Sequence, residues 1–185
     1  QPAILTMSIA CLRAMEEILG ESMPSPSFVA GHSLGQYTAL IASKSMTLST
    51  AAVLVRERGR LMQYASELNS GGMAALIGME DTIIEAICSE TGTEISNLNA
   101  PGQTVISGPS EAIEKAVTLA TERGARRAIT LPVSGAFHSQ LMKPAQEGLD
   151  MAINDVVLND PAIPIVANST GLPLTNREEV KQELS

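Results

Sequence analysis

The sequence predicts an α/β protein in which one small α/β unit is inserted into a larger one. Two observations lead to this prediction. Between residues 69 and 133, short apolar strands and amphipathic helices follow the order β-α-β-β-α-β, which is typical of a ferredoxin-like unit. Outside this stretch, helical segments surround two short apolar strands, at 27–30 and 163–168. We therefore expect a core made of residues 1–68 and 134–185, interrupted by a ferredoxin-like insertion at 69–133.

The segment before the insertion is predicted to be mostly helical. Apolar side chains recur near one face of residues 3–19, and Gly20 followed by two prolines ends this helix. After the strand at 27–30, helices are expected at 36–43 and at 50–68.

The insertion and the segment after it complete the predicted fold. The polar, glycine-rich stretch Asn-Ser-Gly-Gly at 69–72 marks the start of the insertion. Asn-Ala-Pro-Gly at 99–102 separates its two middle strands. Beyond the insertion, a helix is expected to begin at His138 and to continue to Asn154, and a turn is expected at Gly171. The expected strands of the insertion are 73–77, 94–98, 104–107 and 127–133, and its expected helices are 81–90 and 110–123.

The composition narrows the class of protein. Hydrophobic residues make up 44% of the 185 residues and charged residues 17%, which is ordinary for a globular chain. A net charge of −8 with only 2% aromatic residues argues against a nucleic-acid partner. No apolar run approaches the length of a membrane span. Cys11 and Cys88 give no disulfide framework, so we expect a cytoplasmic protein without membrane attachment.

The segment Gly31-His32-Ser33-Leu34-Gly35 has the G-x-S-x-G pattern of a nucleophile elbow, placed between an expected strand and an expected helix. In such an elbow the serine occupies a sharp, strained turn, and the flanking glycines avoid collisions with the adjoining strand and helix. The turn also directs the Leu34 N–H and the helix N-terminus toward the point where an oxyanion would form. We expect Ser33 to be a nucleophile for acyl transfer; the alternative is a glycine-rich turn without chemistry.

A nucleophilic serine needs a general base, and the sequence has two histidines. His32 adjoins Ser33 in the elbow, so its side chain must diverge from the serine hydroxyl. His138 is therefore the predicted base, and the alternative is a surface or capping histidine. No acidic residue stands out as the third member of a triad, because Asp150 and Asp155 lie on or after the expected helix. A main-chain carbonyl could orient the histidine instead.

Five stretches along the chain are GHSLGQYTALIAS, RGRLMQ, GGMAALIG, NAPGQTVISG and LPVSGAFHSQLMKPA. Together and in this order they resemble the malonyl-CoA:acyl carrier protein transacylases and, more loosely, the acyltransferase domains of polyketide and fatty acid synthases. The resemblance extends from Gln1 to about residue 170. It implies an α/β-hydrolase-like core with a ferredoxin-like insertion. It also implies malonyl transfer from malonyl-CoA, through a malonyl-serine ester, to the phosphopantetheine thiol of acyl carrier protein, in fatty acid or polyketide biosynthesis.

The resemblance assigns roles to three residues of the reaction itself. Ser33 is implied to be the acylated nucleophile, His138 the base and later the acid, and the Leu34 N–H one of the oxyanion donors. No metal or redox cofactor is implied.

Four more residues are implied to bind or select the substrate. Arg58 matches the family arginine that holds the free malonyl carboxylate, a role that suits a planar guanidinium. Arg56 and Arg60 are expected on other faces of the helix. Phe137 resembles the bulky residue of malonyl-specific members, so we expect malonyl to be preferred over methylmalonyl. Asn99 and Gln103 resemble positions near the site, although turn chemistry explains them as well.

The sequence also departs from the family pattern. The family's first strand with its Gln-containing, Gly-rich loop, which supplies the second oxyanion donor, has no counterpart in these residues. The same holds for the C-terminal strands and the Gly-Pro-Gly segment, whose region orients the histidine. Gln36 stands where the family often has Glu.

These departures keep other functions open. A serine thioesterase or esterase with the same elbow, a non-catalytic fragment or interaction module, and an acyltransferase domain cut from a larger synthase are the alternatives. Arg58 favours the transferase over an esterase, because an esterase needs no carboxylate clamp. The acidic carrier protein is expected to dock on a local basic patch. The candidates are Arg123, Arg126 and Arg127, or Lys44 with Arg60.

Overall fold

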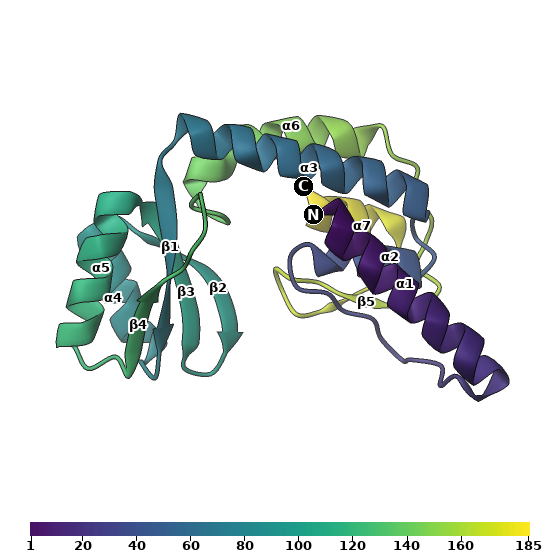
Figure 1. Cartoon of the computed structure of the whole chain (residues 1–185), viewed down its shortest axis with the longest axis horizontal. Coiled ribbons are helices and arrows are strands. Elements are labelled where there is room, and N and C mark those ends of the chain that lie inside the picture. Colours follow the sequence, from purple (N-terminus) through teal and green to yellow (C-terminus); the bar gives the residue numbers. More distant parts are fainter. The chain divides into compact units, whose positions relative to one another are not determined.

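A computed structural model describes all 185 residues and has the predicted α/β class (Figure 1). The chain divides into two units, which we call the elbow unit, Gln1–Gly59 with Gly148–Ser185, and the sheet unit, Arg60–Glu147. Both boundaries fall inside helices, so α3 (Leu48–Leu68) and α6 (Lys143–Asn154) each contribute one end to each unit.

The sheet unit contains one antiparallel sheet with the strand order β2-β3-β1-β4. Its elements follow the β-α-β-β-α-β order expected from the sequence. They are β1 (Gly71–Ile77), α4 (Asp81–Thr91), β2 (Glu94–Ala100), β3 (Gln103–Pro109), α5 (Ser110–Glu122) and β4 (Arg127–Thr130).

Helices α4 and α5 cover one face of this sheet (Figure 1). Ile84 and Ile87 of α4 and Ile113 of α5 are spaced so that they point to the sheet, where they meet Leu76 and Ile106 in a buried core. Gly92 follows α4 in the left-handed conformation that commonly ends a helix. Helical and strand periodicity therefore account for this unit.

The elbow unit packs helices around a small pair of strands. Its core contains Leu5, Leu40, Val55, Ile165 and Val180, each 1% exposed or less. The elements are α1 (Pro2–Leu19), the 3-10 helix η1 (Gly20–Ser22), α2 (Gly35–Ala42), β5 (Ile165–Val166), β6 (Pro173–Leu174) and α7 (Arg177–Leu184), together with the adjoining ends of α3 and α6. No helix of the structure is both long enough and apolar enough to cross a membrane.

The two strands expected in this unit are shorter than predicted. The first, at 27–30, is reduced to an isolated parallel bridge between Val29 and Ile165, and the second is limited to β5. The Val29 N–H donates to the Pro164 carbonyl at 3.0 Å, and the Val166 N–H donates to the Val29 carbonyl at 2.9 Å. Each segment pairs over only one or two residues, so apolar composition alone overestimated its length.

The predicted bounds were wrong at further places, among them β1 and β3, each of which extends two residues beyond one predicted end. The helix expected at His138 begins later, because Ser139 caps the short 3-10 helix η2 (Gln140–Met142) that precedes α6. Strand β4 ends at Thr130, short of the predicted residue 133. The loop predicted at 99–102 is only Pro101-Gly102, because Asn99 and Ala100 continue β2. Strand β6 and helix α7 were not predicted.

Candidate active site

Ser33 lies on a strained turn immediately before α2. Its φ is 51°, in the left-handed region that few residues other than glycine adopt. The turn is closed by the Gly35 N–H, which donates to the His32 carbonyl at 2.9 Å, and by the Gln36 N–H, which donates to the Ser33 carbonyl at 3.1 Å. Neither bond uses the Leu34 N–H, which lies at the first residue before the helix. This is the backbone geometry expected of a nucleophile elbow.

The two glycines of the motif have different roles. A Cβ on Gly31 would lie 1.9 Å from the Gly35 carbonyl oxygen, so only glycine fits there. A Cβ on Gly35 would meet nothing within 4 Å. The prediction that both glycines relieve a collision is therefore right for Gly31 and wrong for Gly35, because the close approach is between the Gly31 Cα and the Gly35 main chain.

Arg58 extends from α3 to the serine. Its Nη2 donates to the Ser33 hydroxyl at 2.9 Å, and its Nη1 donates to the Gln1 side-chain oxygen at 2.6 Å. Its guanidinium carbon lies 5.8 Å from the centre of the Tyr37 ring, within the range of a cation–π contact. Arg58 is 9% exposed, whereas its neighbours Arg56 and Arg60 are exposed. Of the three arginines, Arg58 is the buried one.

The guanidinium contacts only neutral groups. An amide, a hydroxyl and an aromatic ring surround it, and burial lowers the pKa of Arg58 while Tyr37 raises it. Burial also raises the pKa of the Tyr37 phenol, whereas the positive charge of Arg58 lowers it. An arginine remains protonated at neutral pH even so. A buried cation without an acidic partner is costly, and a bound carboxylate would supply the missing charge.

Several residues at this site were not predicted from the sequence. Gln1 and Tyr37 contact Arg58, and Asn168 hydrogen bonds to both ends of the elbow turn. Glu183 binds the Asn168 main chain and the Gln36 side chain. Their partners lie far away in sequence, and only the Asn-x-x-Glu capping pattern at 176–179 could have revealed the helix that contains Glu183.

The other predicted site residues belong to the sheet unit. His138 is exposed and has a φ of 58°, a strained conformation often found at functional residues. The Phe137 carbonyl accepts a hydrogen bond from the Ser107 hydroxyl at 2.7 Å, which fixes the chain just before the histidine. Asn99 and Gln103 are exposed, on β2 and β3. The pairing of Ser33 with His138 stays a prediction.

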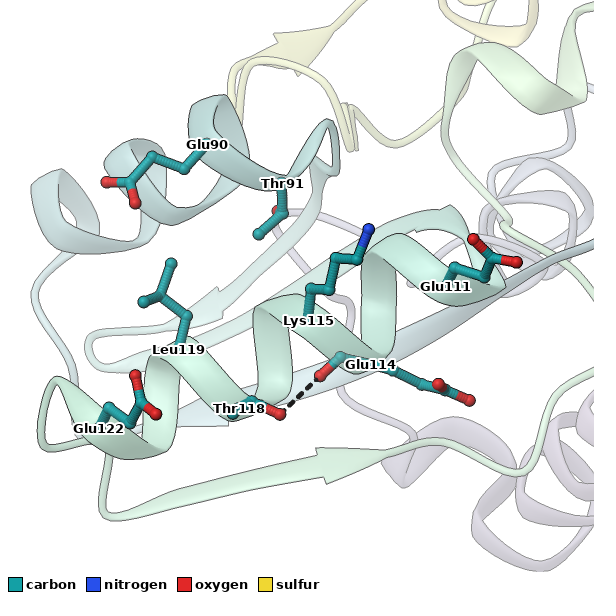
Figure 2. A pocket seen from close by; sticks show the side chains of 8 residues that line it. All are labelled: Glu90, Thr91, Glu111, Glu114, Lys115, Thr118, Leu119 and Glu122. Carbon is teal, nitrogen blue, oxygen red and sulfur yellow. Dashed lines mark hydrogen bonds between the residues drawn. The ribbon is translucent and has the colours of Figure 1, made fainter.

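A separate pocket opens between α4 and α5 of the sheet unit (Figure 2). Carboxylates dominate its lining, with a single lysine among them, and the only hydrogen bond drawn in Figure 2 is local, from the Thr118 hydroxyl to the Glu114 carbonyl at 3.0 Å. None of the site residues predicted from the sequence lines it. The lining residues are Glu90, Thr91, Glu111, Glu114, Lys115, Thr118, Leu119 and Glu122.

A strained serine on a tight turn at a helix N-terminus is typical of α/β proteins that form serine esters with acyl groups. The chain belongs to the acyl transferase domain family, whose model matches residues 1–184. It is 41% identical over 189 residues to the malonyl CoA-acyl carrier protein transacylase of Bacillus subtilis strain 168, and 39% identical over 188 residues to that of Escherichia coli K12. Both alignments include the whole chain, which spans 58% and 60% of these relatives.

Solved structures give the same picture. The acyl-carrier-protein S-malonyltransferases of Bartonella henselae and Burkholderia pseudomallei match with TM-scores of 0.91 and 0.93 and identities of 40% and 42%. A third match is a chain from the structure of a type II polyketide synthase acyl carrier protein in complex with its malonyl-transacylase. Its TM-score is 0.93 and its sequence identity is 36%. Each match covers the whole of this chain and 60% of the other.

Proposed function

We propose that this chain takes part in malonyl transfer from malonyl-CoA to the phosphopantetheine thiol of acyl carrier protein, through an ester on Ser33. Membership of the acyl transferase family and the names of its relatives support the reaction. The observation that carries the proposal is Arg58, a buried cation at 2.9 Å from the Ser33 hydroxyl with no acidic partner. A malonyl group has a free carboxylate that would complete this site.

In the proposed first step, the Ser33 hydroxyl oxygen attacks the thioester carbonyl carbon of malonyl-CoA. The oxygen–carbon bond forms, His138 takes the hydroxyl proton, and the Leu34 N–H donates to the oxyanion. The carbon–sulfur bond then breaks and the proton passes to the leaving CoA thiolate. In the second step the carrier thiol attacks the ester carbonyl carbon, and its proton passes through His138 to the Ser33 oxygen as the carbon–oxygen bond breaks, so that malonyl-carrier leaves. Exclusion of water favours transfer over hydrolysis.

We propose roles in substrate selection and carrier docking from the same family membership. Phe137, next to the base, would leave little room for an α-methyl group and so favour malonyl over methylmalonyl. Asn99 and Gln103 would line the approach of the acyl group. The reaction would need no metal or redox cofactor. For the carrier protein, Arg126 and Arg127 are exposed candidates, whereas the charge of Arg123 is offset by Glu90 at 2.7 Å.

We also propose that the fold is an α/β-hydrolase-like core of residues 1–68 and 134–185 with a ferredoxin-like insertion at 69–133. The antiparallel order β2-β3-β1-β4, with both helices on one face, supports the ferredoxin-like part. The position of the elbow at the start of α2 supports the hydrolase-like part.

The proposal is tested by incubating the chain with malonyl-CoA or acetyl-CoA and measuring its intact mass over time. We expect a malonyl adduct that is absent from Ser33→Ala. Arg58→Ala should lower the rate of malonylation about 10²-fold or more, because it removes a charge-assisted pair, and should leave acetylation much less affected. Arg56→Ala, an exposed arginine two positions away on the same helix, is the matched control and should behave like the parent.

Other outcomes would point to the alternatives. An adduct that water removes faster than a pantetheine thiol does would indicate a hydrolase. A chain that never forms an adduct would be a non-catalytic piece. If Arg58→Ala kept the parent's preference for malonyl over acetyl, the role of Arg58 as a carboxylate clamp would be wrong.

A further inference from the structure

The side chain of Asn168 bridges the two ends of the elbow turn. Its Oδ1 accepts a hydrogen bond from the Ser33 N–H at 2.6 Å, and its Nδ2 donates to the Gly31 carbonyl at 2.7 Å. Asn168 lies two residues after β5, 135 positions from the serine in sequence. One amide therefore satisfies a donor and an acceptor of the strained turn at the same time.

Glu183 in turn fixes the segment that contains Asn168. Its Oε1 accepts from the Asn168 N–H at 2.6 Å and from the Ser169 N–H at 3.1 Å, and its Oε2 accepts from the Ser169 hydroxyl. The same carboxylate accepts from the Gln36 side-chain amide at 3.0 Å, and Gln36 is the second residue of α2. A single carboxylate thus connects α7, the Asn168 segment and the helix that begins at the elbow.

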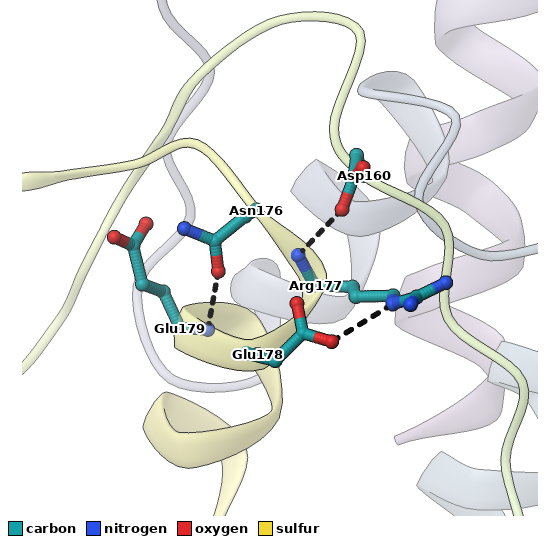
Figure 3. A network of polar contacts seen from close by, with 5 residues as sticks. All are labelled: Asp160, Asn176, Arg177, Glu178 and Glu179. Carbon is teal, nitrogen blue, oxygen red and sulfur yellow. Dashed lines mark hydrogen bonds and ion pairs between the residues drawn. The ribbon is translucent and has the colours of Figure 1, made fainter.

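Helix α7 places Glu183 through a well-defined N-terminus (Figure 3). The Asn176 side chain accepts from the Glu179 N–H at 3.0 Å, and Asp160 accepts from the Arg177 N–H at 3.0 Å. Val180 and Leu184 anchor the helix in the core of the elbow unit. Glu183, one residue before Leu184, then projects from the edge of this buried face.

We propose that Asn168 and Glu183 are positioning residues that hold the elbow so that the Ser33 hydroxyl and the Leu34 N–H are aimed for attack. This inference rests on the proposed function in one respect, that Ser33 is the residue acylated. A φ of 51° is unfavourable for serine, so an elbow without the Asn168 bridge would relax toward commoner backbone angles. The reacting oxygen would then leave the attack geometry, while Arg58 would still hold the malonyl carboxylate.

The first test compares the parent with Asn168→Ala, Asn168→Asp and Asn159→Ala. Asn159 is an exposed asparagine of the same unit and serves as the control. Asn168→Ala should lower the maximal rate of Ser33 malonylation about 10²-fold with little change in the malonyl-CoA concentration that gives half this rate, because a displacement of about 1 Å has this effect. Asn168→Asp keeps the acceptor for Ser33 and should retain more activity than Asn168→Ala. Circular dichroism checks that each variant folds.

Two more readouts separate this inference from the proposed function. A fluorophosphonate phosphonylates serine hydroxyls with loss of fluoride and needs no malonyl site, and amide hydrogen exchange reports the Ser33 N–H directly. A parent that takes the phosphonate but no malonyl group would contradict the proposed function alone. Asn168→Ala with the parent's rates and the parent's Ser33 exchange would overturn the positioning role alone. A parent whose Ser33 no reagent modifies would overturn both.

A second test uses the contact between Gln36 and Glu183. Gln36→Glu would place two carboxylates at a distance now occupied by an amide–carboxylate hydrogen bond of 3.0 Å, and should slow Ser33 acylation about tenfold. Adding Glu183→Gln removes this repulsion and should restore part of the rate. Glu183→Gln alone is measured as well. If the rate reduction of the double variant equalled the product of the reductions in the two single variants, the two residues would act independently, and the connection through Glu183 would be wrong.

Discussion

The sheet unit and the elbow unit hold their important residues in different ways. In the sheet unit, β1 pairs with β3 along its whole length, from Gly71 opposite Pro109 to Ile77 opposite Gln103. In the elbow unit, single side chains contact the serine from 25 and 135 positions away. A ladder distributes its stabilisation over many equivalent hydrogen bonds, whereas each of these two contacts at the elbow is made by a different side chain. Substitutions in the core of the sheet unit should therefore act mainly through stability, and substitutions at the elbow through reactivity.

The largest expected effect is on the core of the sheet unit. Ile106 is fully buried between the sheet and its two helices, so Ile106→Ala should lower the free energy of unfolding by about 3 kcal/mol, as measured in urea. Leu98→Ala is the control, because Leu98 is 68% exposed and its loss should cost less than about 0.5 kcal/mol. Under native conditions, Ser33 should be phosphonylated at the parent's rate in Ile106→Ala. A loss of that reactivity would show that the core of the sheet unit also controls the serine, and would break the comparison.

The next effect is on the turn itself. Gly31→Ala puts a Cβ against the Gly35 carbonyl, and the required backbone shift should cost about 2 kcal/mol and remove most Ser33 acylation. Gly35→Ala has open space at the same atom and should change stability by less than about 0.5 kcal/mol. Both measurements use urea unfolding and the intact mass after acylation. If the two substitutions had equal effects, glycine would be needed at both positions for its backbone angles, and not at Gly31 alone to avoid a collision of the Cβ.

The same difference explains what could be predicted from the sequence. Ile84 and Ile87 repeat with the period of a helix, so the elements of the sheet unit followed from local pattern, and the G-x-S-x-G spacing indicated a strained serine without any structure. Arg58 was singled out by resemblance, and its burial agrees with an inward position. The contacts of Gln1, Asn168 and Glu183 join segments far apart in sequence. No periodicity or turn chemistry encodes such contacts, because they exist only once the unit has folded.

The smallest effect, a pH dependence of stability, tests whether Glu183 acts as a charged acceptor. Burial raises the pKa of Glu183, but hydrogen bonds from Ser169, Gln36 and the Asn168 main chain lower it, and the net shift is downward. A folded-state pKa below the unfolded value means that the stabilisation is complete above about pH 5 and is lost as the pH falls through the folded pKa. The parent should thus lose more stability than Glu183→Gln between about pH 5 and pH 3, by up to about 1 kcal/mol. Urea unfolding of both proteins across this range measures the difference. If the free energies of unfolding of the two proteins changed in parallel with pH, the negative charge of Glu183 would contribute nothing to stability. Glu183 would then bind the Asn168 segment no better than a neutral hydrogen-bond acceptor does.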